Sequence, residues 1–433
     1  MPTIAIIGSG PAGYYTAEAA AKKWGDSAKI DIFDSMPVPY GLIRTGVAPD
    51  HQSIKGVSRR YEKTALTDMV RFVGNITIGS DIGIDELETM YDAVVLATGA
   101  PEDKTLSVEG ADLANVFGSA AFVGWYNGHP KFADLDVDLS GKHAVVIGIG
   151  NVALDVARIL SKTEEEFGGS DVVAHALNAL MQSNLNRITI LGRRGPHQIQ
   201  MTPKELGELG ELKRAQPLVS QADLPSFETD ANLEPGLRKS VALLRRFAAE
   251  PASGKPIAID FDMFASPLRF NGADRVESVT IEETRLDGER AVATGHTYDI
   301  PADIVVTCIG YRTSRIPGVP YDEQLGRFAN DDGRIRDGLY CVGWARRGPT
   351  GTIGTNRPDG FALIDLIEAD LAILPAGKPG RPAFDSFAKE HDLDIVTFRD
   401  WQKIEQAEIS AAREGSPREK FVRIEEMIEA RDG

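Results

Sequence analysis

Two glycine-rich segments have the residue types and spacing that point most directly to chemistry. They are Gly8-Ser9-Gly10-Pro11-Ala12-Gly13 and Gly148-Ile149-Gly150-Asn151-Val152-Ala153. In this fingerprint the first glycine permits a tight turn, and the second lets a pyrophosphate approach the backbone. The third small residue lets a helix pack closely on a strand. Because a helix N-terminus offers free N–H groups and a positive dipole end, the sequence predicts two phosphate-binding loops.

The two segments differ at the end of the strand that follows each loop. Asp34 ends the first such strand, whereas Arg193 and Arg194 end the second. A carboxylate accepts hydrogen bonds from ribose hydroxyls, while arginines bind a 2′-phosphate. A structural turn and a solvated strand end are the alternatives, but the order strand, loop, helix, charged residue favours binding. We therefore expect NADP(H) at the second site and, because a flavin is the natural hydride acceptor, FAD at the first.

Each loop needs a strand before it and a helix after it. The pattern predicts a first β-α-β unit with a strand over 3–8, a helix over 11–23 and a strand over 29–34. It predicts a second unit with a strand over 143–148, a helix over 151–162 and a strand over 187–194. Residues 171–184 are expected to form an extra helix inside the second crossover.

Two further apolar runs resemble each other, "YDAVVLATG" at 91–99 and "PADIVVTCIG" at 301–310. Two copies of one nucleotide-binding plan explain this echo, with Gly99 and Gly310 near the ends of an insertion. We expect an α/β fold with two Rossmann-like dinucleotide-binding domains, the NADP domain inserted into the FAD domain. The FAD domain would comprise 1–102 and 312–433, including peripheral C-terminal helices, and the NADP domain 103–311.

Composition excludes several classes of protein. Lys and Arg number 47 and Asp and Glu 64, and the net charge of −17 disfavours a nucleic-acid partner. No apolar run is long enough to cross a membrane, and no secretory signal is recognisable, so we expect a bacterial cytoplasmic protein. The two cysteines, Cys308 and Cys341, lie in apolar strand-like runs, which favours packing over chemistry. Without a C-x-x-C motif we expect no redox dithiol, iron–sulfur cluster or metal site.

A third segment, "GWARRGPTGTIGTN" at 343–356, precedes a helix expected over 358–373. Backbone N–H groups at Gly351, Thr352 and Ile353 could stabilise negative charge on a reduced flavin ring. Trp344 could stack on the flavin or nicotinamide, with a core tryptophan as the alternative.

Six motifs together resemble the ferredoxin–NADP⁺ reductases of the adrenodoxin reductase type, particularly the bacterial members. They are "GSGPAG", "PYGLIRTGVAPDH", "GIGNVALDVARIL", "GRRGP", "TPKEL" and "GWARRGPTGTIGTN". The resemblance covers nearly the whole chain. It implies a flavoprotein with tightly bound, non-covalent FAD that takes hydride from NADPH and passes single electrons to a ferredoxin-type iron–sulfur protein or a flavodoxin.

The resemblance also implies roles for individual residues. The family's FAD-contacting segment is matched by Pro39, Gly41, Leu42 and Arg44. Asn151 and Val152 match its nicotinamide-nucleotide loop, and Glu205 matches an acid that contacts NADP. His51, Glu208 and Trp344 are implied to be catalytic: His51 and Glu208 match positions implicated in proton handling and nicotinamide placement, and Trp344 matches the segment beside the flavin and nicotinamide. Taken alone, His51 is equally compatible with a hydrogen-bonded loop residue, and Glu205 and Glu208 with a solvated helix face.

Two basic clusters are candidates for docking an acidic acceptor. The first comprises Lys55, Arg59, Arg60 and Lys63, and the second Arg238, Lys239, Arg245 and Arg246. The second lies beside an apolar stripe of Leu237, Val241, Leu244 and Ala248. Ordinary surface helices are the alternative for either cluster, but the resemblance favours the second, because the family docks its ferredoxin on the NADP domain.

Two other functions stay open at this point. A disulfide reductase needs a dithiol and a glutamate-synthase-type partner needs cluster cysteines, and two cysteines supply neither. A flavin monooxygenase remains an alternative on fold alone, since fold does not set the electron acceptor. A nucleotide-binding module without catalysis is the alternative from another class.

Overall fold

The computed structural model describes residues 1–374 and 377–433, which divide into two compact units. The first unit comprises 1–102, 127–133 and 310–433, and the second comprises 103–126 and 134–309. The return to the first unit comes at Gly310 rather than at residue 312. Residues 127–133, expected in the inserted part, group with the first unit instead.

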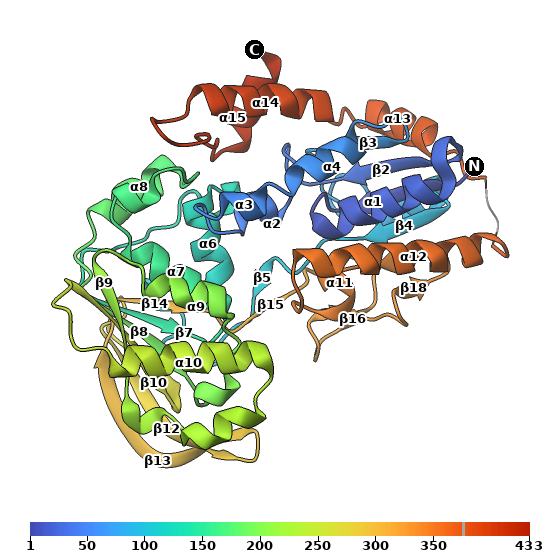
Figure 1. Ribbon diagram of the computed structural model, residues 1–433. Coiled ribbons are helices and arrows are strands. Elements are labelled where there is room, and N and C mark those ends of the chain that lie inside the picture. The colour runs from blue at the N-terminus through green and yellow to red at the C-terminus, as the bar shows by residue number, and fades with distance from the viewer. Residues whose placement is uncertain (375–376) are drawn as a thin grey trace. The chain divides into compact units, whose positions relative to one another are not determined.

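A six-stranded sheet forms the centre of the first unit (Figure 1). Its order is β18 (Arg334–Arg336), β19 (Leu339–Cys341), β4 (Ala93–Leu96), β1 (Thr3–Ile7), β2 (Lys29–Phe33) and β3 (Val70–Val73). All neighbouring strands are parallel except the edge pair β18–β19. Every residue of β1 is buried, as expected for a parallel strand covered on both faces.

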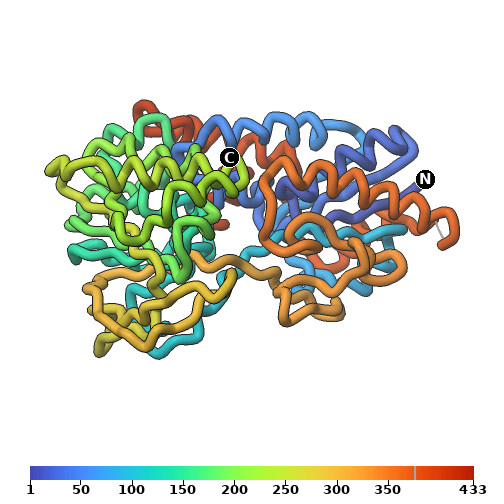
Figure 2. The backbone as a smooth tube through the Cα atoms, turned by 60° about the horizontal axis from the view of Figure 1, so that its bottom comes forward, coloured from blue at the N-terminus to red at the C-terminus, as the bar shows by residue number. Residues whose placement is uncertain are grey.

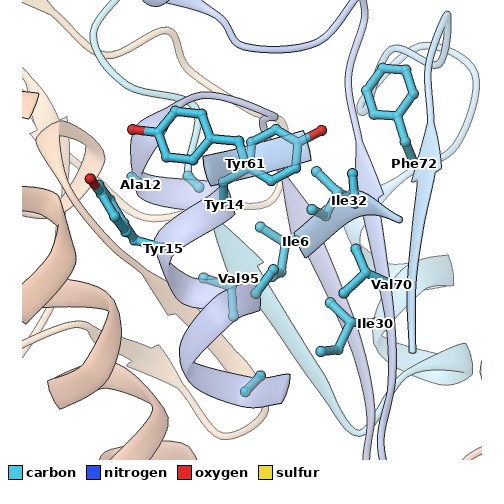
Figure 3. Close-up of a cluster of buried hydrophobic side chains, with 14 of the residues drawn as sticks. Ile6, Ala12, Tyr14, Tyr15, Ile30, Ile32, Tyr61, Val70, Phe72 and Val95 are labelled. Atoms are coloured by element: carbon cyan, nitrogen blue, oxygen red, sulfur yellow. The ribbon is translucent and has the colours of Figure 1, made fainter. Parts of the chain in front are cut away.

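The two faces of this sheet carry separate cores, because successive side chains of a strand point to opposite sides. One core holds Ile6, Ile32 and Val95 under α1 (Pro11–Trp24), α4 (Ser58–Ala65) and α12 (Asn356–Leu371). Figure 3 shows these side chains directed towards α1, where the Tyr14 and Tyr61 rings stack with centroids 5.2 Å apart. The other core holds Ile7 and Leu96 with Phe384 of α13 (Arg381–Glu390).

Helix α12 packs along α1 although the two helices are far apart in the sequence (Figure 1; Figure 2). The C-terminal region adds α13, α14 (Phe398–Ser410) and α15 (Ile424–Asp432), the peripheral helices that were expected. Further elements of the first unit include α2 (Leu42–Thr45), α3 (Gln52–Lys55), α5 (Ile84–Met90), α11 (Trp344–Arg347), β15 (Tyr311–Arg312), β16 (Tyr321–Asp322) and β17 (Arg327–Phe328).

The second unit repeats the parallel plan. Its sheet has the order β6 (Val116–Gly118), β14 (Ile304–Thr307), β7 (His143–Ile147), β8 (Arg187–Gly192), β10 (Ile257–Met263) and β9 (Ala215–Val219), all parallel. Its helices include α7 (Asn151–Ser161), α8 (Ala174–Met181), α9 (Pro203–Leu209) and α10 (Pro235–Ala249). Two Rossmann-like sheets are thus confirmed, as is the extra crossover helix α8.

The second unit also contains an antiparallel sheet that was not expected from the sequence. An antiparallel sheet of β11 (Ala265–Asn271), β12 (Ser278–Asp287) and β13 (Arg290–Pro301) covers one face of the parallel sheet. Phe270 and Ile281 of this sheet pack with Val145 and Val305 of the parallel strands. In residues 1–374 and 377–433, no helix combines the length and apolar character needed to cross a membrane.

A buried carboxylate ties the C-terminal region to the first sheet. Asp31 of β2 is 0% exposed and accepts hydrogen bonds from Arg71 (2.7 and 3.1 Å), from Nε of Arg381 (2.6 Å) and from the Tyr91 hydroxyl (2.6 Å). Arg381 also donates to the carbonyls of Ile30 and Met69. This carboxylate therefore pairs with two arginines in the middle of the strand that leads to Asp34, and one of them, Arg71, also pairs with Asp385 (2.6 Å).

Replacing Asp31 tests this connection. The Asp31→Ala variant leaves Arg381 without its carboxylate partner and Arg71 with Asp385 alone, so we expect the free energy of unfolding to fall by about 3–5 kcal/mol in urea titrations. Asp26→Ala, at an exposed aspartate nearby, should change it by less than about 0.5 kcal/mol. Equal effects of the two substitutions would contradict the structural role of Asp31.

Candidate functional site

The first glycine-rich loop joins β1 to α1 in the first unit. Gly8 has φ +111°, and a Cβ there would lie 2.5 Å from the carbonyl oxygen of Ala97. A Cβ at Gly13 would lie 2.0 Å from the carbonyl oxygen of Gly8, so helix and strand approach too closely for a side chain. At Gly10, in contrast, the nearest atom is 4.0 Å away, which leaves open space at the N-terminus of α1. Pro11 occupies the first helical position, where its missing N–H costs nothing, and Ala12 is buried behind it.

Asp34 follows β2, and Ser9 of the first glycine-rich loop holds its carboxylate by hydrogen bonds. Its Oδ2 accepts hydrogen bonds from the backbone N–H (2.9 Å) and the hydroxyl (2.5 Å) of Ser9, and its Oδ1 accepts one from the N–H of Met36 (3.0 Å). Burial raises the pKa of Asp34 above its ordinary value, although these hydrogen bonds oppose the rise. A carboxylate has about four acceptor positions, so capacity remains for a ribose hydroxyl. The loop and its acid therefore fit an adenine dinucleotide.

The segment over 39–45 lies against this loop. A Cβ at Gly41, where φ is +50°, would lie 3.1 Å from the Cα of Gly10. Pro39 is buried and Leu42 is 40% exposed. Arg44 departs from the expectation that it contacts FAD, because it is buried and forms an ion pair with Glu408 of α14. Its role in binding the cofactor stays a prediction.

The second glycine-rich loop joins β7 to α7 in the second unit. Gly148 has φ +139°, and a Cβ there would lie 2.3 Å from the carbonyl oxygen of Cys308. No atom lies within 4 Å of a Cβ built at Gly150, the residue before the helix. Ala153 is fully buried at the third position of the fingerprint. The second loop thus has the same tight turn and the same open approach as the first.

Asn151 and Val152 form the first turn of α7 beside this opening. The Asn151 Oδ1 accepts a hydrogen bond from the backbone N–H of Thr202 (2.8 Å), just before α9. Nothing in the sequence pattern indicates this bond. It links the phosphate loop to the "TPKEL" segment 51 residues further along.

Arg193 and Arg194 follow β8 with their charges free. In the part of the chain that the structure describes, neither guanidinium has an ion-pair partner, and Arg193 is exposed. Their backbone is nonetheless anchored, since the Arg193 carbonyl accepts a hydrogen bond from the Thr284 hydroxyl (2.8 Å) and the Arg194 carbonyl one from the N–H of Phe264 (3.4 Å). Two uncompensated guanidinium groups on an anchored backbone suit a doubly charged phosphate.

Glu205 and Glu208 lie on α9, as expected, but in different surroundings. Glu208 Oε2 is 3.3 Å from Nε of Arg158, a buried arginine that also donates to Asp155 (2.8 Å). Glu205 lies in the first turn of the helix and is half-buried. The structure thus assigns Glu208 an ion pair that the sequence did not indicate, and its catalytic role stays a prediction.

His51 and Trp344 lie in the first unit. His51 is buried, and its carbonyl accepts the N–H groups of Ile54 (3.0 Å) and Lys55 (3.2 Å), so its backbone starts α3. The Trp344 Nε1 donates to the carbonyl of Thr350 (2.9 Å), and its ring stacks on Tyr311 with centroids 6.3 Å apart. Trp344 is half-buried, and its roles with a flavin or nicotinamide remain predictions, as do those of His51.

The segment after Trp344 forms a capped helix start. Thr352 is the N-cap of a 3₁₀ turn at Ile353–Thr355, which leads into α12, and its N–H donates to the Thr355 hydroxyl (3.0 Å). Gly351 has φ +83°, a conformation that favours glycine. Gly99 (φ +66°) has no atom within 4 Å of a built Cβ, and its carbonyl accepts the Thr313 hydroxyl (2.9 Å). Gly351 therefore occupies a turn that favours glycine, and Gly99 leaves open space beside its backbone. Both residues were expected to lie beside a cofactor.

The sequence missed two residues of the first site. Ser9 supplies two hydrogen bonds to Asp34, and Tyr40, with φ 89°, donates its N–H to the carbonyl of Ser9 (3.1 Å). A non-glycine residue in this conformation gives no compositional signal. Among the described residues, no group of three or more His, Cys, Asp or Glu side chains could hold a metal ion. Burial raises the pKa of Cys341 to about 12 and that of Cys308 further, so neither thiol is poised to react.

Some cations of the two basic clusters are buried or paired within the fold. In the first, Lys55 is buried and Arg60 is bound to Glu18 (2.8 and 2.9 Å). In the second, Arg245 forms a two-bond ion pair with Asp230 (2.7 and 2.8 Å), which also bonds His197.

The other cations of α10 face outward to different degrees. Arg238 donates to the carbonyl of Leu233 (2.9 Å), and Arg246 lies 3.3 Å from Glu250. Lys239 is exposed and has no ion-pair partner in the described part of the chain. Arg245 is thus paired within the fold, and its expected place among the docking cations stays a prediction.

Comparison with known proteins gives full-length matches. Residues 2–191 match the family described as pyridine nucleotide-disulphide oxidoreductase. The human mitochondrial NADPH:adrenodoxin oxidoreductase is 39% identical over 450 residues, which cover 99% of this chain and 91% of that protein. The NADPH-ferredoxin reductase FprA of Mycobacterium tuberculosis is 37% identical over 452 residues, covering 98% of each chain. The solved structure of that FprA in complex with NADPH matches with a TM-score of 0.97 at 35% identity, covering 100% of both chains.

Substitution of the second-loop glycines separates binding from folding. Gly150→Ala fits the backbone (φ −122°) but places a methyl group where a pyrophosphate would approach. We expect a rise of about tenfold in the dissociation constant for NADPH with an unchanged melting temperature. Gly148→Ala should lower the melting temperature, because its φ and the 2.3 Å contact both forbid a side chain. Unchanged NADPH binding in Gly150→Ala, measured by titration calorimetry, would contradict the loop assignment.

Proposed function

The chain belongs to the family of NADPH-dependent adrenodoxin and ferredoxin reductases, and we propose that it carries electrons from NADPH, by way of FAD, to a ferredoxin-type iron–sulfur protein. The family membership expected from the six motifs is confirmed, with identities of 37–39% over at least 98% of the chain. The cofactors of the family are FAD and NADP(H), and the enzyme is an oxidoreductase.

The observation that carries the proposal is the difference between the ribose ends of the two loops. The first loop ends at Asp34, which is held by Ser9, and the second ends at Arg193 and Arg194, whose charges have no partner among the described residues. Two loops of one plan that differ in this way fit one dinucleotide with a free 2′-hydroxyl and one with a 2′-phosphate. This difference supports FAD on the first unit and NADP(H) on the second.

The chain's own contribution is binding, orientation and charge compensation. When bound, the flavin would accept a hydride from the nicotinamide and release single electrons. The open backbone at Gly10 and Gly150 would receive the two pyrophosphates at helix N-termini, where N–H groups and the helix dipole favour anions. Arg193 and Arg194 would select the 2′-phosphate. The proposed roles of His51 and Glu208 are proton handling and nicotinamide placement.

The direct test of this function is anaerobic turnover with NADPH and a purified ferredoxin. We expect two ferredoxins to be reduced per NADPH oxidised, because a hydride carries two electrons and the cluster accepts one. NADPH oxidation that requires oxygen and an organic substrate would instead indicate a monooxygenase. A protein that binds both nucleotides but oxidises no NADPH would be a binding module.

The arginine pair makes a separate prediction about cofactor choice. Arg193→Ala combined with Arg194→Ala removes charge-assisted contacts worth about 1.5–3 kcal/mol each. We expect the KM for NADPH to rise at least about tenfold and the KM for NADH to change little. Steady-state assays with both nucleotides check this, and an unchanged NADPH/NADH ratio would contradict the assignment.

Docking of the acceptor is proposed on the outward face of α10. Arg238, Lys239 and Arg246 are the exposed cations of this cluster that remain once Arg245 is assigned to Asp230, and an acidic ferredoxin needs local positive charge on a chain of net charge −17. A flavodoxin, which is also acidic as a class, would fit the same surface.

Charge reversal at two of these positions tests the docking surface. Lys239→Glu with Arg246→Glu should lower kcat/KM for ferredoxin about tenfold at low salt while NADPH–ferricyanide activity stays unchanged. Arg59→Glu with Lys63→Glu, at exposed positions on α4, is the matched control and should have no effect. If the control lowers ferredoxin reduction instead, the acceptor docks on the first unit.

We also propose that the protein acts in the bacterial cytoplasm. Two free cysteines fit a reducing compartment, and the FprA relatives are bacterial.

A further inference from the structure

A buried ion pair connects the C-terminal region of the chain to the first phosphate loop. Glu408 of α14 is 0% exposed, and its carboxylate accepts hydrogen bonds from both terminal nitrogens of Arg44, one of them at 2.9 Å. The two residues are separated by 364 positions in the sequence. Nothing in the fingerprint of the loop predicts this partner.

Glu408 collects further donors from the segment that follows its own helix. The N–H of Phe421 donates to it at 3.0 Å, and Arg418 approaches it at 3.4 Å. Lys420, buried beside them, donates to the carbonyl of Arg44 (3.3 Å). The region 408–421 therefore binds both the side chain and the backbone of Arg44.

A short series of contacts connects Arg44 to the first phosphate loop. Gly41 lies three residues before Arg44 and packs closely against Gly10. A Cβ built at Gly41 would lie 3.1 Å from the Cα of Gly10. Tyr40 donates its N–H to the carbonyl of Ser9 (3.1 Å), and its ring meets Trp401 of α14 edge-on with centroids 6.0 Å apart. The 39–45 segment is thus pinned on one side by the phosphate loop and on the other by α14.

We propose that Glu408 is a positioning residue for FAD retention, which through Arg44 holds the 39–45 segment against Gly10. The open space at Gly10 is where a pyrophosphate would lie, and the segment forms the wall beside it. Without the carboxylate, Arg44 becomes an uncompensated buried cation and leaves its site, and the segment leaves with it. The inference rests on the proposed placement of FAD on the first unit.

The rate of FAD release measures this role directly. In Glu408→Gln holoenzyme, the recovery of flavin fluorescence after dilution should be faster by about tenfold or more. With FAD in excess, kcat for NADPH–ferricyanide should return to the wild-type value, because Glu408 retains the cofactor and takes no part in turnover. Glu408→Asp keeps the charge balanced but is one methylene shorter, and should release FAD at an intermediate rate. This second variant keeps the test valid if Glu408→Gln does not fold.

Asp370→Asn is the matched control for loss of stability alone. Asp370 is a buried carboxylate of the same unit, bound to Arg334 and to the Tyr340 hydroxyl (2.8 Å). It lies in the last turn of α12, about 21 Å along the helix axis from Asn356, the first residue of that helix. This control should lower the melting temperature without speeding the release of FAD.

Two results would overturn the proposal. One is a wild-type rate of release in both Glu408 variants, and the other is equal release at equal loss of stability in Asp370→Asn. A wild-type protein that never retains FAD would contradict the proposed function instead, so the two failures are distinguishable.

Discussion

Close approach of backbone to backbone at two strand–helix turns is the constraint on which both sites depend. At Gly8 and Gly148 a side chain would collide with the carbonyl of a neighbouring strand end, Ala97 or Cys308. At Gly10 and Gly150, by contrast, the space in front of the helix is open. Each turn thus presents helix N–H groups to an approaching phosphate and excludes side chains from its path. The parallel sheets fix where these turns lie.

The chain uses this constraint twice and varies only the residues around it. Asp34 is occupied by Ser9 and Met36 but keeps acceptor capacity, while Arg193 and Arg194 keep their charges free. The difference is consistent with one resident and one exchanging dinucleotide. The C-terminal region adds a feature to the first site alone, because Glu408 reaches the 39–45 segment there.

Local patterns were sufficient to predict both loops, the two Rossmann-like domains and three strands of each parallel sheet, whereas β3, β6, β9 and β10 were not expected. The expected helix over 11–23 and the observed α1 at Pro11–Trp24 begin at the same residue, because proline and the glycine turn define the start. They differ by one residue at the end. The antiparallel sheet of β11–β13 was missed, since no motif or echo accompanies it. The grouping of 127–133 with the first unit was also missed, because it depends on tertiary contacts that a linear pattern does not contain.

Charged side chains were the least predictable part of the candidate site. Arg44, Glu208 and Arg245 were each expected to face a cofactor or partner, and each forms an ion pair within the fold. Their partners Glu408, Arg158 and Asp230 lie between 15 and 364 residues away in the sequence. A cation on a helix is free or paired only according to what folding brings beside it, whereas the steric demands of a glycine turn are local. Glycine positions were therefore predicted better than charges.

Anaerobic single-turnover mixing with nicotinamide nucleotides tests the central claim most directly. The claim is that one site holds a flavin and the other admits a 2′-phosphorylated dinucleotide that reduces it. Rapid mixing with NADPH should bleach the flavin absorbance at a rate that saturates with nucleotide concentration. NADH at equal concentration should bleach it at least about tenfold more slowly, because it lacks the phosphate that Arg193 and Arg194 are proposed to bind. Equal rates with the two nucleotides, or a flavin that NADPH never bleaches, would contradict the account.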